Sequence, residues 1–155
     1  MTQKYINRQS RDKIYLILHN VRSLYTVGSI FRTADAAGVS KIFLTGYTPE
    51  PAPKTALGAE KYVPWEKMLN TQCLTLLKKN KVQVVALEQA KGAADYRKFK
   101  PKFPMALILG NEVRGLSPPL LKKCDKIIYI PMRGRKESLN VSVACGVALF
   151  SLIKY

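Results

Sequence analysis

The sequence predicts an α/β fold with a mainly parallel sheet flanked by helices. Short apolar runs of strand length recur along the chain, and segments with helical spacing of apolar residues separate them. The runs are apolar on both faces, which is typical of strands that helices cover on both sides of a sheet. Strands that alternate with helices favour parallel connections.

Five strands are expected along the chain. They occupy residues 14–18, 41–45, 82–87, 105–109 and 127–130. The last strand ends at Pro131, because proline has no N–H to give to a sheet ladder. Residues 46–64 are rich in proline and are expected to form a loop, and the lysine-rich residues 91–102 an exposed connection.

Helices are expected between the strands. Residues 27–37 place their apolar side chains on one face, and Gly38 suits the position that follows a helix. Residues 65–80 have amphipathic spacing and are predicted to be helical. A pair of prolines at 118 and 119 starts a short helix over 120–123.

The last helix is expected over residues 141–152. Ser138 and Asn140 precede it, and both are favourable N-caps. The helix is apolar nearly all round, so it is either deeply buried or pressed against a partner chain. A strand, a polar loop and a helix start in succession are a frequent place for a ligand site.

The length of 155 residues fits one domain over 1–155, with a basic arm at 1–13. The hydrophobic content of 47% excludes a disordered chain. Three scattered cysteines without a signal peptide indicate reduced thiols in a cytoplasmic protein. One histidine makes a metal site improbable, and no apolar run is long enough to span a bilayer.

The chain is strongly basic, with 26 lysines and arginines against 10 acidic residues and a net charge of +16. A polyanion is the natural partner of such a chain, and RNA or DNA is the commonest polyanion. The alternative is a basic surface that serves only solubility.

Three segments, in this order, resemble the motifs of one family. They are Asn20-Val21-Arg22 with residues 27–35, then 107–116, then 130–144. Together they resemble the SpoU/TrmH-type RNA 2′-O-ribose methyltransferases of the SPOUT superfamily, from about residue 15 to residue 152. The resemblance implies an α/β domain with a C-terminal deep trefoil knot that holds S-adenosylmethionine, and a homodimer. Many family members carry an extra RNA-binding domain, which is not expected here.

The resemblance places the cofactor pocket at the loops after the third, fourth and fifth strands. The cofactor-binding residues that it implies are Leu87, Gly110, Ile130, Met132, Ser138, Leu139 and Asn140. Physically, such loops offer backbone groups and an apolar slot to a nucleobase, and a glycine allows close approach. The alternative for residues 110–115 is an ordinary turn.

The catalytic residues that the resemblance implies are Arg32, Glu112, Ser138 and Asn140. Arg32 is expected to fix the target phosphate and to stabilise the developing alkoxide; a role as base is left open, because guanidinium groups scarcely deprotonate. Glu112 is expected to organise the site by holding asparagine or arginine side chains, or else to be a helix-start charge. Ser138 and Asn140 are expected to touch cofactor and ribose, besides capping the helix.

RNA contacts are expected from residues on all three motifs and their flanks. These are Asn20, Arg22, Thr26, Arg32, Arg114, Arg133 and Arg135. Thr26 departs from the family, which usually has asparagine six residues before the arginine of the first motif. The single His19 is as well explained by a satisfied hydrogen bond at a strand end as by catalysis.

The sequence therefore favours an S-adenosylmethionine-dependent enzyme that methylates a ribose 2′-OH of tRNA or rRNA. The alternatives are a non-catalytic RNA-binding or ribosome-assembly protein on the same fold, and a SPOUT enzyme that methylates a base. Arg32, Glu112, Ser138 and Asn140 together favour an enzyme, and the Ser-Leu-Asn of the third motif favours ribose.

Overall fold

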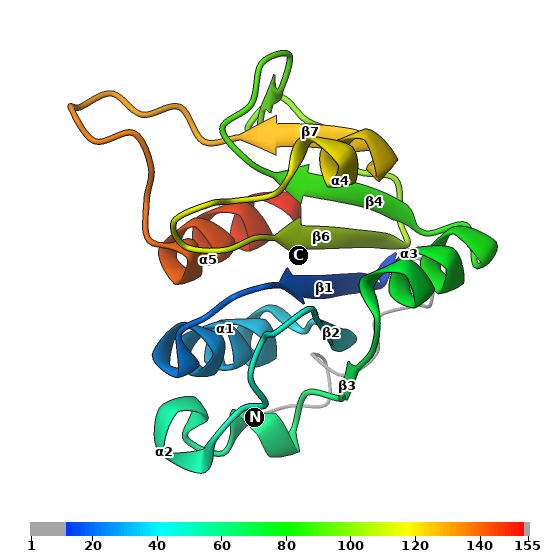
Figure 1. Ribbon diagram of the computed structural model, residues 1–155, viewed down its shortest axis with the longest axis vertical. Coiled ribbons are helices and arrows are strands. Elements are labelled where there is room, and N and C mark those ends of the chain that lie inside the picture. The colour runs from blue at the N-terminus through cyan, green and yellow to red at the C-terminus, as the bar shows by residue number, and fades with distance from the viewer. Residues whose placement is uncertain (1–11, 154–155) are drawn as a thin grey trace.

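The computed structural model describes residues 12–153, which form a sheet with helices on both faces (Figure 1). The strands are β1 (Ile14–His19), β2 (Lys41–Thr45), β3 (Trp65–Lys67), β4 (Gln83–Leu87), β5 (Ala94–Asp95), β6 (Met105–Leu109) and β7 (Lys126–Tyr129). Of the predicted basic arm, only Asp12 and Lys13 lie within the described residues. The five predicted strands are confirmed, with ends that differ by a residue, and β3 and β5 are additions at the sheet edges.

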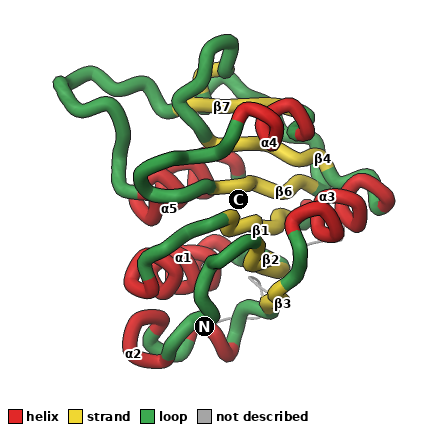
Figure 2. Tube along the Cα trace, viewed as in Figure 1, coloured by secondary structure: helices red, strands yellow, loops and turns green. Residues whose placement is uncertain are grey.

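In the described part of the chain the sheet has seven strands in the order β3-β2-β1-β6-β4-β7-β5, and all neighbours pair in parallel. Strands β1, β6 and β4 lie in the middle, and all five residues of β6 are buried. Because the strands are parallel, their carboxyl ends lie at one edge of the sheet, on the left in Figure 2, where long loops gather.

The helices are α1 (Leu24–Ala37), α2 (Pro53–Ala56), α3 (Asn70–Lys79), α4 (Pro118–Lys123) and α5 (Val141–Leu152), with a 3-10 helix, η3 (Ala59–Lys61). The last helix has the predicted bounds. Helix α1 begins three residues earlier than predicted, because the Ser23 hydroxyl caps it by accepting from the Thr26 N–H (3.3 Å).

The prediction of one helix over residues 65–80 is wrong in its first part. Residues 65–67 extend the sheet as β3, where Trp65 pairs with Ile42 of β2, and the helix begins only at Asn70. Pairing with an available sheet edge outweighs the local helical spacing here, because strand formation depends mainly on tertiary context.

Two apolar layers cover the sheet. Helices α1 and α5 pack on one face over side chains such as Leu16 and Leu18, and α3 and α4 pack on the other over Ile17. The alternation along β1 sends neighbouring side chains to opposite layers. No helix among residues 12–153 is long and apolar enough to cross a membrane.

Candidate cofactor and substrate site

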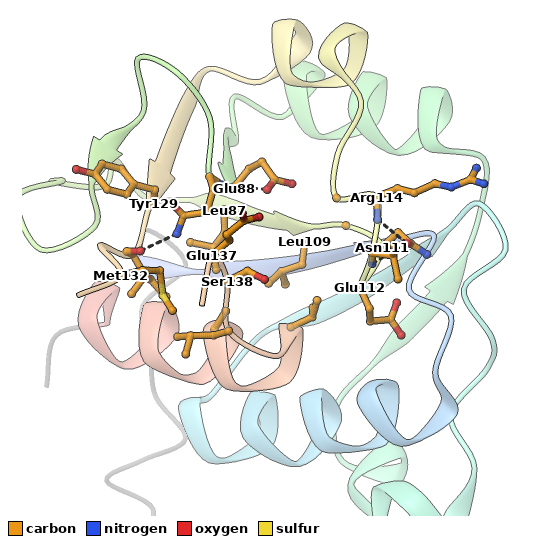
Figure 3. Close-up of a pocket in the computed structure, with 18 residues that line it drawn as sticks. Leu87, Glu88, Leu109, Asn111, Glu112, Arg114, Tyr129, Met132, Glu137 and Ser138 are labelled. Carbon is orange, nitrogen blue, oxygen red and sulfur yellow. Dashed lines mark hydrogen bonds between the residues drawn. The ribbon is translucent and has the colours of Figure 1, made fainter. Parts of the chain in front are cut away.

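A cavity of about 250 Å³ lies at the carboxyl edge of the sheet, where the loops after β4, β6 and β7 meet (Figure 3). Crevices at the carboxyl ends of parallel strands are the usual ligand sites of α/β proteins. Its walls come from residues 87–89, 109–115, 129–130, 132, 137–139, 141 and 144. They include six of the seven residues predicted to bind the cofactor, Asn140 being the exception.

The chemistry of the lining differs from that of the chain as a whole. Among residues 12–153, Glu88, Glu112 and Glu137 line the cavity with a single basic side chain, Arg114, although basic residues outnumber acidic ones by 26 to 10 in the chain. The other walls combine apolar side chains, such as Leu87, Ile130 and Leu139, with polar groups. A cavity of this kind suits a ligand with a flat apolar group and a positive charge.

The loop after β6 is a tight turn that also forms a cavity wall. The Gly115 N–H donates to the Asn111 carbonyl (2.9 Å), and the Asn111 Oδ1 accepts from the N–H groups of Val113 and Arg114 (both 2.9 Å). Gly110 is required, because a Cβ there would lie 2.7 Å from the Gly115 carbonyl carbon. The loop is therefore an ordinary turn and also a wall of the cavity, and its contact with the cofactor stays a prediction.

Two residues that sequence reasoning missed hold the three loops together. The Glu88 Oε2 accepts from the Leu116 N–H (2.8 Å), and the Gln89 Nε2 donates to the Ile130 carbonyl (2.7 Å). Both residues directly follow β4. Their place as the first polar residues after a buried strand was the signal that could have identified them.

Glu112 joins the second motif to the first. Its Oε1 and Oε2 accept from the backbone N–H groups of Arg22 and Ser23, each at 2.8 Å. Its partners are thus backbone groups, in contrast to the asparagine or arginine side chains that were expected. The carboxylate lies at the first turn of α1, where a negative charge is favourable.

The third motif contributes Ser138 and Leu139 to the cavity, but Asn140 turns to the helix. The Asn140 Oδ1 accepts from the N–H of Ser142 (2.9 Å) and from its hydroxyl (2.6 Å), and so caps α5. Asn140 therefore positions its neighbours from the start of α5 and does not line the cavity itself.

A second hollow, of about 810 Å³, adjoins the cavity. Arg22, Ser23 and Tyr47 line it together with residues 111–114, which belong to both hollows. We call this second hollow the adjoining groove. It brings together two of the arginines predicted to contact RNA, Arg22 and Arg114, although 92 positions separate them in the sequence.

Asn20 forms hydrogen bonds that hold loops together at this edge of the sheet. Its Oδ1 accepts from the Tyr47 N–H (3.0 Å), and its carbonyl accepts from the Asn111 Nδ2 (3.0 Å). Asn20 thus connects the loops after β1, β2 and β6, and the predicted contact of its side chain with RNA gives way to this structural role.

The remaining residues predicted to contact RNA lie apart from both hollows. Thr26 is a correction: it is only 6% exposed, because it faces the core side of α1, so it cannot contact RNA. Arg32 is exposed on α1, and Arg133 and Arg135 are exposed in the loop between β7 and α5, drawn in orange in Figure 1. None of these three arginines lines the cavity or the adjoining groove.

His19 is a satisfied strand-end histidine. Its Nδ1 lies 2.8 Å from the Thr45 hydroxyl and its Nε2 3.3 Å from the Asn20 Nδ2. Burial lowers the pKa of His19 below its usual 6.5, because the charged form loses solvation.

The three cysteines are unpaired, and Cys73 and Cys145 are buried. Burial is the largest cause that raises the pKa of the thiols, to about 12 for Cys73 and Cys145 and to about 11 for Cys124. Within the described residues, no three histidine, cysteine or acidic side chains gather where they could hold a metal ion.

Comparison with known proteins places this chain in one family. Residues 13–150 match the model of the SpoU rRNA Methylase family. The chain is 36% identical over 146 residues to a 23S rRNA (guanosine-2′-O-)-methyltransferase of Yersinia pestis, covering 90% of this chain and 58% of that one. It is 33% identical over 152 residues to a tRNA (guanosine(18)-2′-O)-methyltransferase of Aquifex aeolicus, covering 96% and 72%.

Among solved structures, an AdoMet-bound rRNA methyltransferase from Sinorhizobium meliloti superposes with a TM-score of 0.83 at 34% identity, over 95% of this chain and 58% of that one. The chain belongs to the SpoU rRNA methylase family, as its motifs predicted. It spans about 60% of the length of several of the curated relatives that it matches.

Proposed function

We propose that this chain transfers a methyl group from S-adenosylmethionine to a ribose 2′-OH of tRNA or rRNA. The observation that carries the proposal is the acid-lined, partly apolar cavity that the second and third SpoU motifs build at the carboxyl edge of the sheet. Relatives named as 2′-O-methyltransferases of 23S rRNA and of tRNA support this reaction. The cavity itself suits a cationic donor better than an anionic one.

The lining fits S-adenosylmethionine, which supplies an electrophilic methyl group on a sulfonium. Leu87, Ile130 and Leu139 offer an apolar slot for the adenine, beside the backbone of Gly110. Met132 adds to the same wall. The carboxylate of Glu137 and those of Glu88 and Glu112 favour the positive charge of the donor.

The acceptor ribose is placed between the cavity and the adjoining groove, which share residues 111–114. Arg22 and Arg114 neutralise phosphates on either side, and the hydroxyl of Ser138 faces the ribose from the cavity. Because a methyl transfer needs in-line geometry, most of the work of the chain is to position the two substrates.

Arg32 acts, in this proposal, from a second copy of the chain. It is exposed on α1 beside Thr33, whose Cγ2 lies against Gly146 of α5. Helix α5 exposes an apolar stripe of Val143, Val147 and Phe150, which are 51%, 37% and 45% exposed. A homodimer that covers this stripe would carry Arg32 of one copy to the cavity of the other, where it stabilises charge on the ribose oxygen.

The proposal includes the C-terminal trefoil knot of the family. Strand β7 is separated from β1 by β4 and β6, yet α5 packs against α1 on the β1 side. Residues 130–140 must therefore pass the carboxyl ends of β4 and β6, where the loop after β6 also lies.

We place the enzyme in the cytoplasm, and its unpaired cysteines support this compartment.

The test measures transfer of a tritiated methyl group to bulk tRNA and rRNA, with calorimetric titration of S-adenosylmethionine beside it. Arg32→Ala should reduce transfer by roughly 10²–10³-fold, the effect of losing one charge-stabilising group, and should leave cofactor affinity unchanged. Asn140→Ala should weaken both, because the cap of α5 positions Ser138 and Leu139.

Near-normal transfer by Arg32→Ala would contradict the role of Arg32. Methyl groups found on bases would favour the base-methylating alternative, and RNA binding without cofactor binding would favour the non-catalytic one. Mixed dimers of Arg32→Ala and Asn140→Ala chains should regain about a quarter of wild-type activity, since half of the dimers are mixed and each has one intact site. No recovery on mixing would place Arg32 in its own cavity.

A further inference from the structure

Tyr47 is an exposed aromatic residue in the adjoining groove. It follows β2 after one glycine, and its side chain is 56% exposed. The groove places it with Arg22 and Arg114, two basic side chains from different loops. The groove thus combines an exposed aromatic ring with two positive charges, which a single exposed side chain elsewhere on the surface does not offer.

The Tyr47 ring is held in place from two sides. Its backbone N–H donates to the Asn20 Oδ1 (3.0 Å), and its hydroxyl accepts from the Asn111 Nδ2 (3.0 Å). Gly46 has a φ of +63°, and a Cβ at this position would collide with the Asn20 Oδ1, so only glycine permits the arrangement. The ring is therefore fixed before any ligand arrives, which lowers the cost of binding.

The Tyr47 ring is not stacked on another aromatic ring in the part of the chain that the structure describes. The aromatic pair there is Tyr15 with Phe43, and the cation–π contact is Lys41 with Phe43. A flat π surface that is fixed, open and flanked by cations matches one ligand chemistry in particular: a nucleobase with its phosphates.

We propose that Tyr47 is the stacking platform for an unpaired base of the substrate RNA. In a duplex the bases are stacked on one another, so only a loop, bulge or end can offer a base to this ring. Residues 111–114 separate the adjoining groove from the cavity, so a base on Tyr47 brings its ribose to the edge of the cavity. The substrate class is thus an unpaired nucleotide whose neighbouring phosphates contact Arg22 and Arg114.

This inference rests on the proposed function for the identity of the ligand, but its test needs no methyl donor. The probe is a fluorescein-labelled single-stranded RNA that carries one 5-iodouracil. Irradiation crosslinks the halogenated base to an aromatic ring stacked on it, and mass spectrometry maps the site. Fluorescence anisotropy on the same probe measures affinity.

The expected result is a crosslink to Tyr47 that Tyr47→Leu abolishes. Tyr47→Leu should weaken binding roughly 5- to 150-fold, the range for the loss of one base–aromatic stack. Tyr47→Phe keeps the ring and should bind almost as the wild type does. Tyr62→Leu is the matched control, because Tyr62 is 74% exposed and lies outside the groove. Fully paired RNA of the same sequence should not distinguish Tyr47→Leu from the wild type.

Three outcomes would overturn the inference. The first is wild-type affinity of Tyr47→Leu for the single-stranded probe, and the second is a crosslink that maps only to another residue, such as Tyr25. The third is a Tyr47→Phe variant as weak as Tyr47→Leu, which would mean that Tyr47 only holds Asn111. A wild-type chain that crosslinks at Tyr47 but methylates no RNA would instead refute the proposed function and leave this inference standing.

Discussion

Replacing Glu112 by alanine tests how the first and second motifs are joined. The carboxylate accepts two hydrogen bonds at the start of α1, from the backbone N–H groups of Arg22 and Ser23, with N···O distances of 2.8 Å each. Glu112→Ala leaves both donors without this partner and removes a negative charge from the helix N-terminus. The start of α1 and the rim of the adjoining groove should therefore loosen together.

The magnitude follows from the two hydrogen bonds. A hydrogen bond to a charged group contributes about 1.5–3 kcal/mol, but water can replace the carboxylate at these exposed and part-buried donors. We expect Glu112→Ala to lower the free energy of unfolding by about 1–3 kcal/mol in total. For a chain of this length the Tm should fall by about 3–10 °C.

Urea unfolding followed by far-UV circular dichroism, with methyl transfer measured on the same samples, checks this expectation. Glu112→Gln keeps one oxygen acceptor and should lose about half as much stability. Glu137→Gln is the control: it removes a carboxylate from the same cavity, so it should weaken cofactor binding and leave the unfolding curve unchanged. An unchanged Tm for Glu112→Ala would show that the two bonds contribute nothing to the fold.

The other predictions concern packing, pH and salt. Gly28→Ala should lower the free energy of unfolding by about 1–3 kcal/mol, because the added Cβ would collide with the backbone of Thr55. Gly146→Ala is the comparison in thermal melts: its Cβ has room, so it should be neutral or stabilising. Burial lowers the pKa of His19 below 6.5, so the stability that its neutral form contributes is present above pH 6.5 and is lost as the pH falls towards the folded-state pKa. In His19→Gln the midpoint of urea unfolding should therefore depend less on pH over this range. RNA affinity should fall steeply with salt, and Arg22→Ala should reduce the slope of log K against log salt by about 0.7 on single-stranded RNA; an equal slope would remove Arg22 from phosphate contact.

The resemblance to the family implied much of the site, and the geometry of parallel strands gives the physical reason. Leu87 and Ile130 end predicted strands and Gly110 follows one, and the carboxyl ends of parallel strands meet at one edge of the sheet. The roles of Glu88 and Gln89 escaped prediction, since their partners belong to loops that are distant in the sequence. The exposure of Tyr47 could not be anticipated either, because it depends on which neighbours approach the loop after β2.

Local patterns in the sequence were sufficient to predict the class of fold, the positions of five strands and the bounds of the last helix. Apolar periodicity and helix caps are local properties, so residues such as Pro131 and Asn140 reveal them directly. The motifs also identified the family, which the match over residues 13–150 confirmed. The strand at residues 65–67 could be seen only in the tertiary structure, because an edge strand forms where an unpaired strand of a sheet lies beside it. Thr26 is buried, Asn20 bonds to other loops of the fold and Arg32 lies on the surface for the same kind of reason. The exposure of a side chain is set by packing between segments that are distant along the chain.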